Sequence, residues 1–164
     1  MKEFAEDDCY FMAIAKSVAR RSTCTRREVG AVIVRDGKIL STGYNGPPQG
    51  IRHCDIVGCL REELGIKSGE HHELCRGIHA EQNAIVNAAR FGISIYGSKI
   101  YITTFPCSLC AKMIVNSGIR EVIYLEEYAD NFSAQILRDG GIIVRKLSVD
   151  ECDYAEDCTN GASY

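Results

Sequence analysis

Apolar and polar positions follow two different periods in the first part of the chain. Between residues 6 and 22, apolar side chains recur at positions 11, 14, 15, 18 and 19, a spacing that predicts an amphipathic helix. The β-branched run VGAVIVR at 29–35 and the shorter run at 38–42 predict two strands. Because Asp36 and Gly37 separate these runs, we expect a tight hairpin between them.

Helix-like and strand-like segments alternate in the second half of the chain. Helices are expected at 78–91, 107–117 and 131–139, and strands at 98–104, 120–125 and 140–147. Alternating segments of this kind favour parallel pairing of the later strands, with helices on both faces of the sheet. The pattern therefore predicts an α/β fold with a mixed sheet in three layers.

Residues 49–76 show no clean period, although Leu60–Leu64 has the composition of a helical turn. An irregular segment of this length usually carries a functional site or is held in place by a structural cross-link of its own. This one is rich in metal-binding side chains, which are Cys54, Cys59, His71, His72 and Cys75.

The composition narrows the class of protein. A chain of 164 residues, with 46% hydrophobic and 25% charged residues, predicts one globular domain, which we place at residues 1–147. A net charge of −3 does not indicate the basic surface that binds nucleic acid, so we expect no nucleic-acid partner. No apolar run approaches the ~18 residues of a membrane span, so we expect no membrane partner either.

Nine cysteines suggest either disulfides or metal sites. The acidic start MKEFAEDDCY is unlike a signal peptide, so we expect a cytoplasmic protein that uses cysteines for metal. The polar stretch 148–164 is expected to be a mobile tail. Cys152 and Cys158 within it are expected to be incidental surface thiols, and Cys9 has no assigned role.

The candidate chemistry lies in two short motifs, His79-Ala80-Glu81 and the PCSLC run at 106–110. His79, Cys107 and Cys110 offer one imidazole and two thiolates, a set that suits a zinc ion with one position left for water. Alone, the PCxxC run could be a redox dithiol or half of a structural zinc site. Together with HxE it is the signature of zinc-dependent nucleobase deaminases.

In that chemistry Glu81 is the proton carrier. It would take a proton from the attacking water, deliver it to ring N3 of cytosine and later help to protonate the departing amine. Ala80 leaves its backbone groups free to contact the edge of the base.

The chain resembles the deoxycytidylate (dCMP) deaminases of the cytidine deaminase-like superfamily over roughly residues 8–147. The resemblance rests on three motifs: GYNG at 43–46, HAEQNAI at 79–85 and PCSLCAK at 106–112. It implies a three-layer α/β/α sandwich with a five-stranded mixed sheet, and hydrolysis of dCMP to dUMP and ammonia for dTMP supply.

The resemblance also suggests residues that bind the nucleotide. Asn45 would grip the sugar, although an Asn-Gly pair is equally expected in a simple turn. Arg26 is a candidate for the phosphate, and an exposed, unpartnered arginine is the alternative. Tyr128 would pack on the base or sugar unless it belongs to the core.

Regulation and assembly are implied by the resemblance alone. Members are often hexamers, activated by dCTP with Mg²⁺ and inhibited by dTTP, so we expect a homo-oligomer, either a hexamer or a dimer. Arg90 matches a position linked to that effector site, although a cation also suits the C-terminal end of a helix.

Microbial members often carry a second, structural zinc. The matching residues here are Cys24, Cys54, His72 and Cys75, with Cys59 or His71 as possible substitutes. Such a Cys₃His site would anchor the 49–76 insertion to the end of the first helix. The alternative is that these cysteines pack as small apolar side chains.

Other functions stay open at this point. The acidic balance and the GYNG motif disfavour a tRNA adenosine deaminase, and the insertion disfavours a free cytidine deaminase. A deaminase that also accepts dCTP is not distinguished. A zinc-stabilised nucleotide-binding module without catalysis is disfavoured by Glu81, because a structural zinc needs no adjacent proton carrier.

Overall fold

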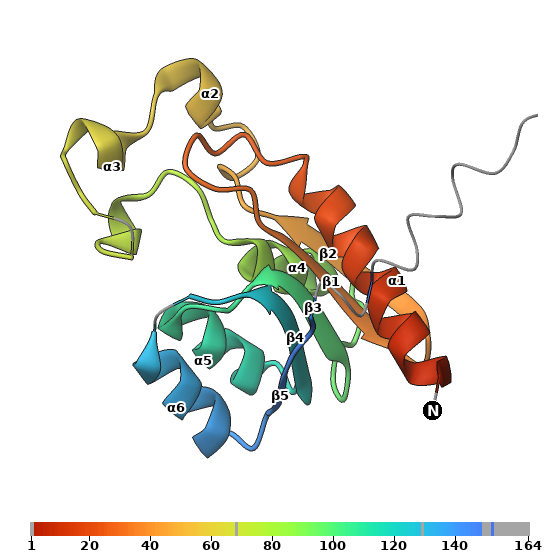
Figure 1. The fold of residues 1–164 in the computed structure, drawn as a ribbon. Coiled ribbons are helices and arrows are strands. Elements are labelled where there is room, and N and C mark those ends of the chain that lie inside the picture. The colour runs from red at the N-terminus through yellow and green to blue at the C-terminus, as the bar shows by residue number, and fades with distance from the viewer. Residues whose placement is uncertain (1, 68, 129, 149–151, 153–164) are drawn as a thin grey trace, which may run out of the picture.

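A five-stranded sheet forms the centre of the molecule (Figure 1). The computed structural model describes residues 2–67, 69–128, 130–148 and 152, with side chains from residue 7 onward. The strand order is β2-β1-β3-β4-β5. The strands are β1 (Gly30–Arg35), β2 (Lys38–Tyr44), β3 (Lys99–Thr104), β4 (Glu121–Glu126) and β5 (Ile143–Lys146).

The sheet is mixed, as predicted. β1 pairs antiparallel with both β2 and β3, whereas β3, β4 and β5 run parallel. The turn between β1 and β2 places Asp36 at φ 52° and Gly37 at φ 69°. Two consecutive positive φ values are what an Asp-Gly hairpin turn requires, so the predicted hairpin is confirmed.

Helices cover both faces of the sheet and confirm the three-layer α/β/α fold. Helix α1 (Lys2–Ala19) lies on one face, where Phe11, Met12 and Ala15 pack against side chains of β1, β3 and β4. Helices α4 (Ala80–Arg90), α5 (Ser108–Asn116) and α6 (Asn131–Asp139) cover the opposite face. No helix of the described residues is both long and apolar enough to cross a membrane.

Helix α1 ends three residues before the predicted boundary. The Arg21 amide donates to Val18 and the Ser22 amide to Ala19, at 3.0 and 2.9 Å, so the chain tightens into i→i+3 turns after Ala19. Local periodicity could not locate this end, because Arg20 and Arg21 are also suitable helix residues.

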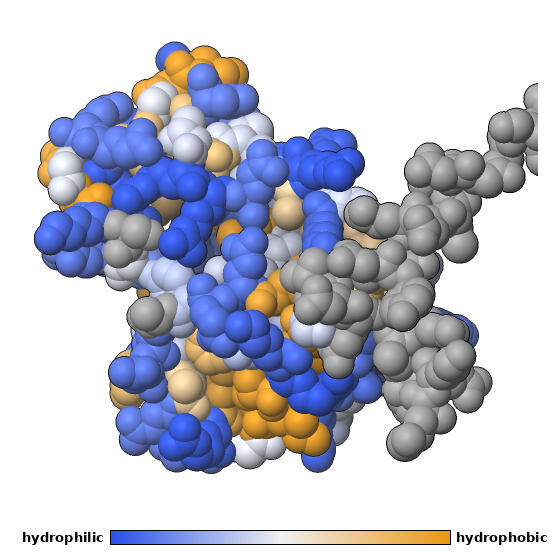
Figure 2. Space-filling model, in the orientation of Figure 1, coloured by the Kyte–Doolittle hydropathy of each residue, from blue (hydrophilic) through white to orange (hydrophobic). Residues whose placement is uncertain are grey.

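The 49–76 insertion projects from the sheet at the upper left of Figure 1. It contains α2 (Cys54–Val57), α3 (Leu60–Glu63) and a 3₁₀ turn at His72–Leu74. The predicted helical turn at Leu60–Leu64 is therefore present, and two further turns were missed because each is too short to show a period. Figure 2 shows a largely hydrophilic surface here with an apolar tip over α2, where Ile56 is 73% exposed.

Glycine at position 43 allows β2 to pack directly on the first turn of α4. A Cβ atom there would overlap the Ala80 carbonyl oxygen and the Ala84 backbone nitrogen. The first residue of the GYNG motif therefore fixes the height at which α4 begins above the sheet.

Cys152 differs from its prediction as an incidental surface thiol. It forms a disulfide with Cys9 of α1 and packs, half-buried, against the apolar cluster beneath that helix. The pairing joins residues 143 positions apart, so no local pattern could have revealed it. Beyond Ser148 only Cys152 is described, so the predicted mobile tail and Cys158 otherwise lie outside the described residues.

Candidate active site

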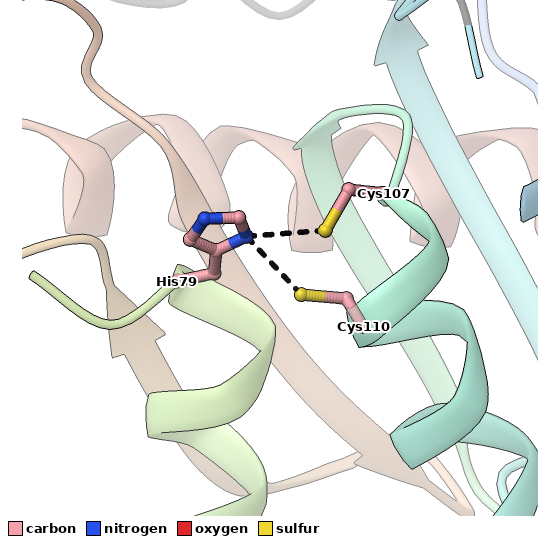
Figure 3. A group of neighbouring side chains, drawn as sticks. All are labelled: His79, Cys107 and Cys110. Atoms are coloured by element: carbon pink, nitrogen blue, oxygen red, sulfur yellow. Dashed lines mark hydrogen bonds between the residues drawn. The ribbon is translucent and has the colours of Figure 1, made fainter. Parts of the chain in front are cut away.

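His79 and Cys107 each stand at the N-terminal end of a helix, and their side chains point toward one another (Figure 3). His79 precedes α4, and Cys107 precedes α5, just after the end of β3. The His79 Nδ1 atom lies 3.4 Å from Cys107 Sγ and 3.3 Å from Cys110 Sγ. The donor atoms of all three residues lie within 4.8 Å of one another.

Polar contacts hold these two helix ends in place. The His79 backbone N–H donates to Gln82 Oε1 at 2.9 Å, which satisfies one of the free amides at the start of α4. Asp130 accepts from the Ser108 amide and from the Ser133 amide, both at 2.9 Å. One carboxylate therefore caps α5 and α6 together and orients the helix that carries Cys110.

The two cysteines differ in acidity. A hydrogen bond from the Cys110 thiol lowers the pKa of Cys107 to about 4, with a further contribution from His79. The same bond, together with burial, raises the pKa of Cys110 well above its usual value. Cys107 is thus a thiolate at neutral pH, which is the form that binds metals.

Glu81 lies on the first turn of α4 beside the donor triad and is only 4% exposed. Burial raises the pKa of Glu81 above its usual value. A carboxyl group with a raised pKa takes up a proton more readily than a free one, which suits general acid–base catalysis.

The three donors fit a zinc ion. One imidazole nitrogen and two sulfurs, one of them already a thiolate, match the ligand types that zinc prefers. Three protein ligands also leave one position of a tetrahedral ion for water, the arrangement of a catalytic site. Among the described residues no other group of three potential ligands lies this close together.

A cavity of about 120 Å³ opens in front of the donor triad. Glu81 and the fully buried Ala80 form its floor, together with His79 and Cys107. The lining of the cavity includes all the residues predicted to bind substrate, which are Arg26, Asn45, Ala80 and Tyr128. The structure therefore brings together residues that are far apart in the sequence.

The Asn45 side chain is already engaged with the protein. Its Oδ1 atom accepts from the Val29 amide and its Nδ2 atom donates to the Arg27 carbonyl, both at 2.8 Å. Asn45 therefore fixes the segment that carries Arg26 and Arg27. One N–H and one lone pair of the amide remain for a ligand.

Tyr128 lies between the cavity and the insertion. The Arg27 guanidinium lies 5.4 Å from the centre of its ring, and its hydroxyl lies 3.4 Å from His72 Nε2. The His72 ring in turn meets the His79 ring edge-on at 4.9 Å. The His72 side chain thus contacts the active-site wall, while its buried Nδ1 atom has no hydrogen-bond partner among the described residues.

Four cysteines form a second cluster at the rim of the same cavity: Cys24, Cys54, Cys59 and Cys75. Burial raises the pKa of Cys54, and the charges of the other three cysteines raise it further, so the four thiols lie within electrostatic reach of one another. Three of the four predicted ligands, Cys24, Cys54 and Cys75, are in this cluster with the possible substitute Cys59, and the fourth, His72, lines the same cavity.

Arg90 lies outside the cavity. Its guanidinium donates to Gln49 Oε1 at 3.0 Å and lies 5.9 Å from the Phe91 ring centre, on an exposed part of α4. His71, the other substitute considered for the second zinc, is exposed and pairs with Glu73 at 2.9 Å.

Two residues of the site were missed by sequence reasoning. Arg61 of α3 lines the cavity and is only 8% exposed, and Asp130 caps two helices at once. A charged residue in an irregular loop is normally exposed, so no local signal marked Arg61. The Asp130-x-x-Ser133 spacing is a recognisable helix-capping pattern that could have revealed Asp130.

A three-layer α/β/α fold that presents one histidine, two cysteines and an adjacent glutamate at two helix ends is typical of zinc-dependent nucleobase deaminases. Residues 5–126 match the family described as "Cytidine and deoxycytidylate deaminase zinc-binding region". The chain therefore belongs to the cytidine and deoxycytidylate deaminase family.

Individual relatives agree with this assignment. The chain is 40% identical to ComE operon protein 2 of Bacillus subtilis over 143 residues, covering 87% of this chain and 71% of that protein. It is 41% identical to deoxycytidylate deaminase of Saccharomyces cerevisiae over 145 residues, covering 88% of this chain but only 46% of the yeast enzyme.

Among solved structures, the dCMP deaminase of cyanophage S-TIM5, in complex with dCMP and dUMP, superposes with a TM-score of 0.72. Its sequence is 34% identical, and the match covers 84% of this chain and 94% of the phage chain.

Proposed function

We propose that this protein hydrolyses dCMP to dUMP and ammonia. The observation that carries the proposal is the convergence of His79, Cys107 and Cys110 beside the buried carboxyl of Glu81, in a cavity whose walls also hold arginines. The relatives named as deoxycytidylate deaminases support the choice of substrate. The longer yeast enzyme has regions with no counterpart in this chain, so the proposal concerns the shared domain.

His79, Cys107 and Cys110 would hold the zinc ion. The chemistry that zinc supplies when bound is a water acidic enough to attack as hydroxide near neutral pH. Glu81 would accept a proton from that water, transfer it to ring N3 of the cytosine and then help to protonate the departing amine. The raised pKa of Glu81 supports this role, because the group must gain and lose a proton in each turnover.

The nucleotide would be held by the cavity walls. Ala80, the first residue of α4, would present backbone groups to the base, and Tyr128 would pack beside the base or sugar. Asn45 would contact the sugar with its remaining N–H group, and Arg26 would bind the phosphate. Arg26 Nη1 supports this role, because it is buried and has no hydrogen-bond partner among the described residues.

A direct test measures ammonia release from dCMP, deoxycytidine, cytidine, dCTP and adenosine, with and without a zinc chelator. Chelator-sensitive release from dCMP above the other substrates is the expected result. Equal rates on dCMP and dCTP would identify a bifunctional deaminase. Release from none of them by zinc-loaded protein would favour a nucleotide-binding module without catalysis.

We also propose a structural zinc in the insertion, held by Cys24, Cys54, Cys59 and Cys75, with His72 as the alternative to Cys59. The mutual influence of these thiols on the pKa of Cys54 supports the grouping. The buried Nδ1 atom of His72 has no hydrogen-bond partner among the described residues, which keeps His72 available as a ligand. Metal analysis should find two zinc ions per chain, and one after Cys59→Ser. A count of two in Cys59→Ser but one in His72→Ala would restore the Cys₃His set.

A homo-oligomer in the cytoplasm, either a hexamer or a dimer, is a further part of the proposal. The edge strand β5 exposes Ile143 and Val144, and Figure 2 shows an apolar area over this side of the sheet. An apolar sheet edge of this kind is normally covered by a partner. Light scattering during size-exclusion chromatography should give the mass of an oligomer, and a monomer would contradict the proposal.

Regulation by dCTP with Mg²⁺ and by dTTP would act at Arg90. Its exposed position at the end of α4, the helix that follows His79, supports a link to the active site. Arg90→Gln should lose the response of dCMP turnover to added dCTP or dTTP. An unchanged response would place the effector elsewhere.

A further inference from the structure

Arg61 is a buried cation without a counterion. It lies on α3 within the insertion and is only 8% exposed. The ion pairs of the described residues involve His71, Lys99, Arg145 and Lys146 as cations, so Arg61 has no carboxylate within 4.0 Å. Arginine is almost never buried unless it is paired, because its charge loses its hydration. An anion from outside the described chain would satisfy this group.

Most of the Arg61 donors are unused. Its Nη2 atom donates to the Lys67 carbonyl at 3.0 Å, which fixes the guanidinium within the insertion. Its Nε atom is buried and has no hydrogen-bond partner among the described residues. A guanidinium held from one side, with free donors on the other, is suited to bidentate binding of a phosphate.

Arg61 lies in the wall of the catalytic cavity, whose rim also carries the cysteine cluster. It lines the cavity that contains Glu81 and His79. Its charge acts on the pKa values of His72, His79 and Tyr128. The cation among the chief influences on the pKa of Cys54 is instead Arg76. Arg61 therefore lies within electrostatic reach of residues around the donor triad.

We propose that Arg61 is a specificity-determining residue that binds the 5′-phosphate of the nucleotide, together with Arg26, which lines the same cavity. Two arginines from separate segments would then read one phosphate group, and the insertion would contribute directly to substrate selection. The inference rests on the proposed dCMP deamination and assigns a second residue to the phosphate end of that site.

The test compares kcat/KM for dCMP with that for deoxycytidine, which lacks the phosphate. Arg61→Gln should lower the ratio of the two values about 10- to 100-fold, since it removes charge-assisted hydrogen bonds to the phosphate. Arg76→Gln is the matched control, an exposed arginine of the same insertion that does not line the cavity, and its ratio should equal that of the wild type. The dCMP-to-deoxycytidine ratio of Arg61→Lys should lie between those of Arg61→Gln and the wild type.

A binding measurement separates this inference from the proposed function. Inorganic phosphate should raise the Tm of the zinc-loaded wild type and of Arg76→Gln, but not that of Arg61→Gln, whether or not dCMP is turned over. An unchanged dCMP-to-deoxycytidine ratio in Arg61→Gln would overturn the inference. The inference would also be overturned if Arg61→Gln lost zinc and lost kcat/KM equally on dCMP and deoxycytidine. A third contrary result would be an equal rise in Tm with phosphate in the wild type, Arg76→Gln and Arg61→Gln. Failure of the wild type to deaminate dCMP would instead overturn the proposed function.

Discussion

The Asn45 side chain donates to the Arg27 carbonyl at 2.8 Å and thereby ties the GYNG loop to the segment that carries two cavity arginines. The same amide accepts from Val29 at 2.8 Å, so one side chain connects the end of β2 to the start of β1. The position of Arg26 in the cavity wall depends on this connection.

Asn45→Ala should therefore weaken both the fold and substrate binding. Loss of one partly buried and one exposed hydrogen bond should lower the free energy of unfolding by about 1–2 kcal/mol, and KM for dCMP should rise. Urea unfolding and steady-state kinetics measure the two effects. Asn116→Ala, an exposed asparagine of α5, is the control and should behave as wild type. A variant with unchanged stability and kinetics would show that the loop does not depend on Asn45.

Gly43→Ala should destabilise the protein because the new Cβ would overlap the backbone of α4 at Ala80 and Ala84. Overpacking of this kind typically costs about 1–3 kcal/mol, and here it would also shift Glu81. Gly46→Ala is the control for stability, since its Cβ would meet only the Tyr44 ring, at 3.6 Å. Thermal unfolding should give a lower Tm for Gly43→Ala than for Gly46→Ala. Equal Tm values would contradict the close packing of β2 on α4.

Asp130 should give the protein a measurable stability change in acid. Although burial raises the pKa of Asp130, hydrogen bonds from the Ser133 and Ser108 amides outweigh it and lower the pKa. The folded protein therefore binds this proton less readily than the unfolded chain. The stabilisation is fully present above the unfolded pKa of about 4 and is lost as the pH falls through the lower, folded value.

The Tm difference between the wild type and Asp130→Ala measures this contribution. At neutral pH the variant should lose about 1–2 kcal/mol, as expected for the loss of a helix cap, and the difference should shrink below about pH 4. Asp130→Asn keeps an oxygen acceptor and should be less affected. If the Tm difference between the wild type and Asp130→Ala grew in acid, the carboxylate of Asp130 would not be the stabilising form.

The Cys9–Cys152 disulfide should stabilise the protein without affecting catalysis. It lies with α1 on the face of the sheet opposite α4 and α5. Cross-linking residues 143 positions apart is worth up to about 5 kcal/mol in chain-entropy terms, so reduction should lower the Tm. In Cys9→Ser the Tm should no longer respond to reductant, while dCMP turnover should equal that of the wild type. Alkylation of both cysteines in non-reduced protein, detected by mass spectrometry, would contradict the pairing.

The sequence predicted those features that depend on local pattern. The apolar β-branched run of β1, the Asp36-Gly37 turn and the helix at Asn131–Asp139 all follow from residue pattern and turn residues. The zinc triad was also predictable, because each half of it is a compact motif at a helix start.

Features that depend on contacts between distant segments were not predictable. The burial of Arg61, the pairing of Cys9 with Cys152 and the contact of His72 with His79 each join parts of the chain that no periodicity relates. The role of Asn45 was only half predicted, since an Asn-Gly pair indicates a turn but not the backbone groups that its amide binds.

The most direct test of the central claim is the rate of dUMP formation by Glu81→Gln, measured together with its zinc content. The substitution keeps the size of the side chain and leaves His79, Cys107 and Cys110 in place. The variant should retain as much zinc as the wild type, while kcat should fall at least ~10²-fold, since general acid–base catalysis contributes about 10²–10⁴. Near-normal kcat in a fully zinc-loaded variant would show that Glu81 is not the proton carrier.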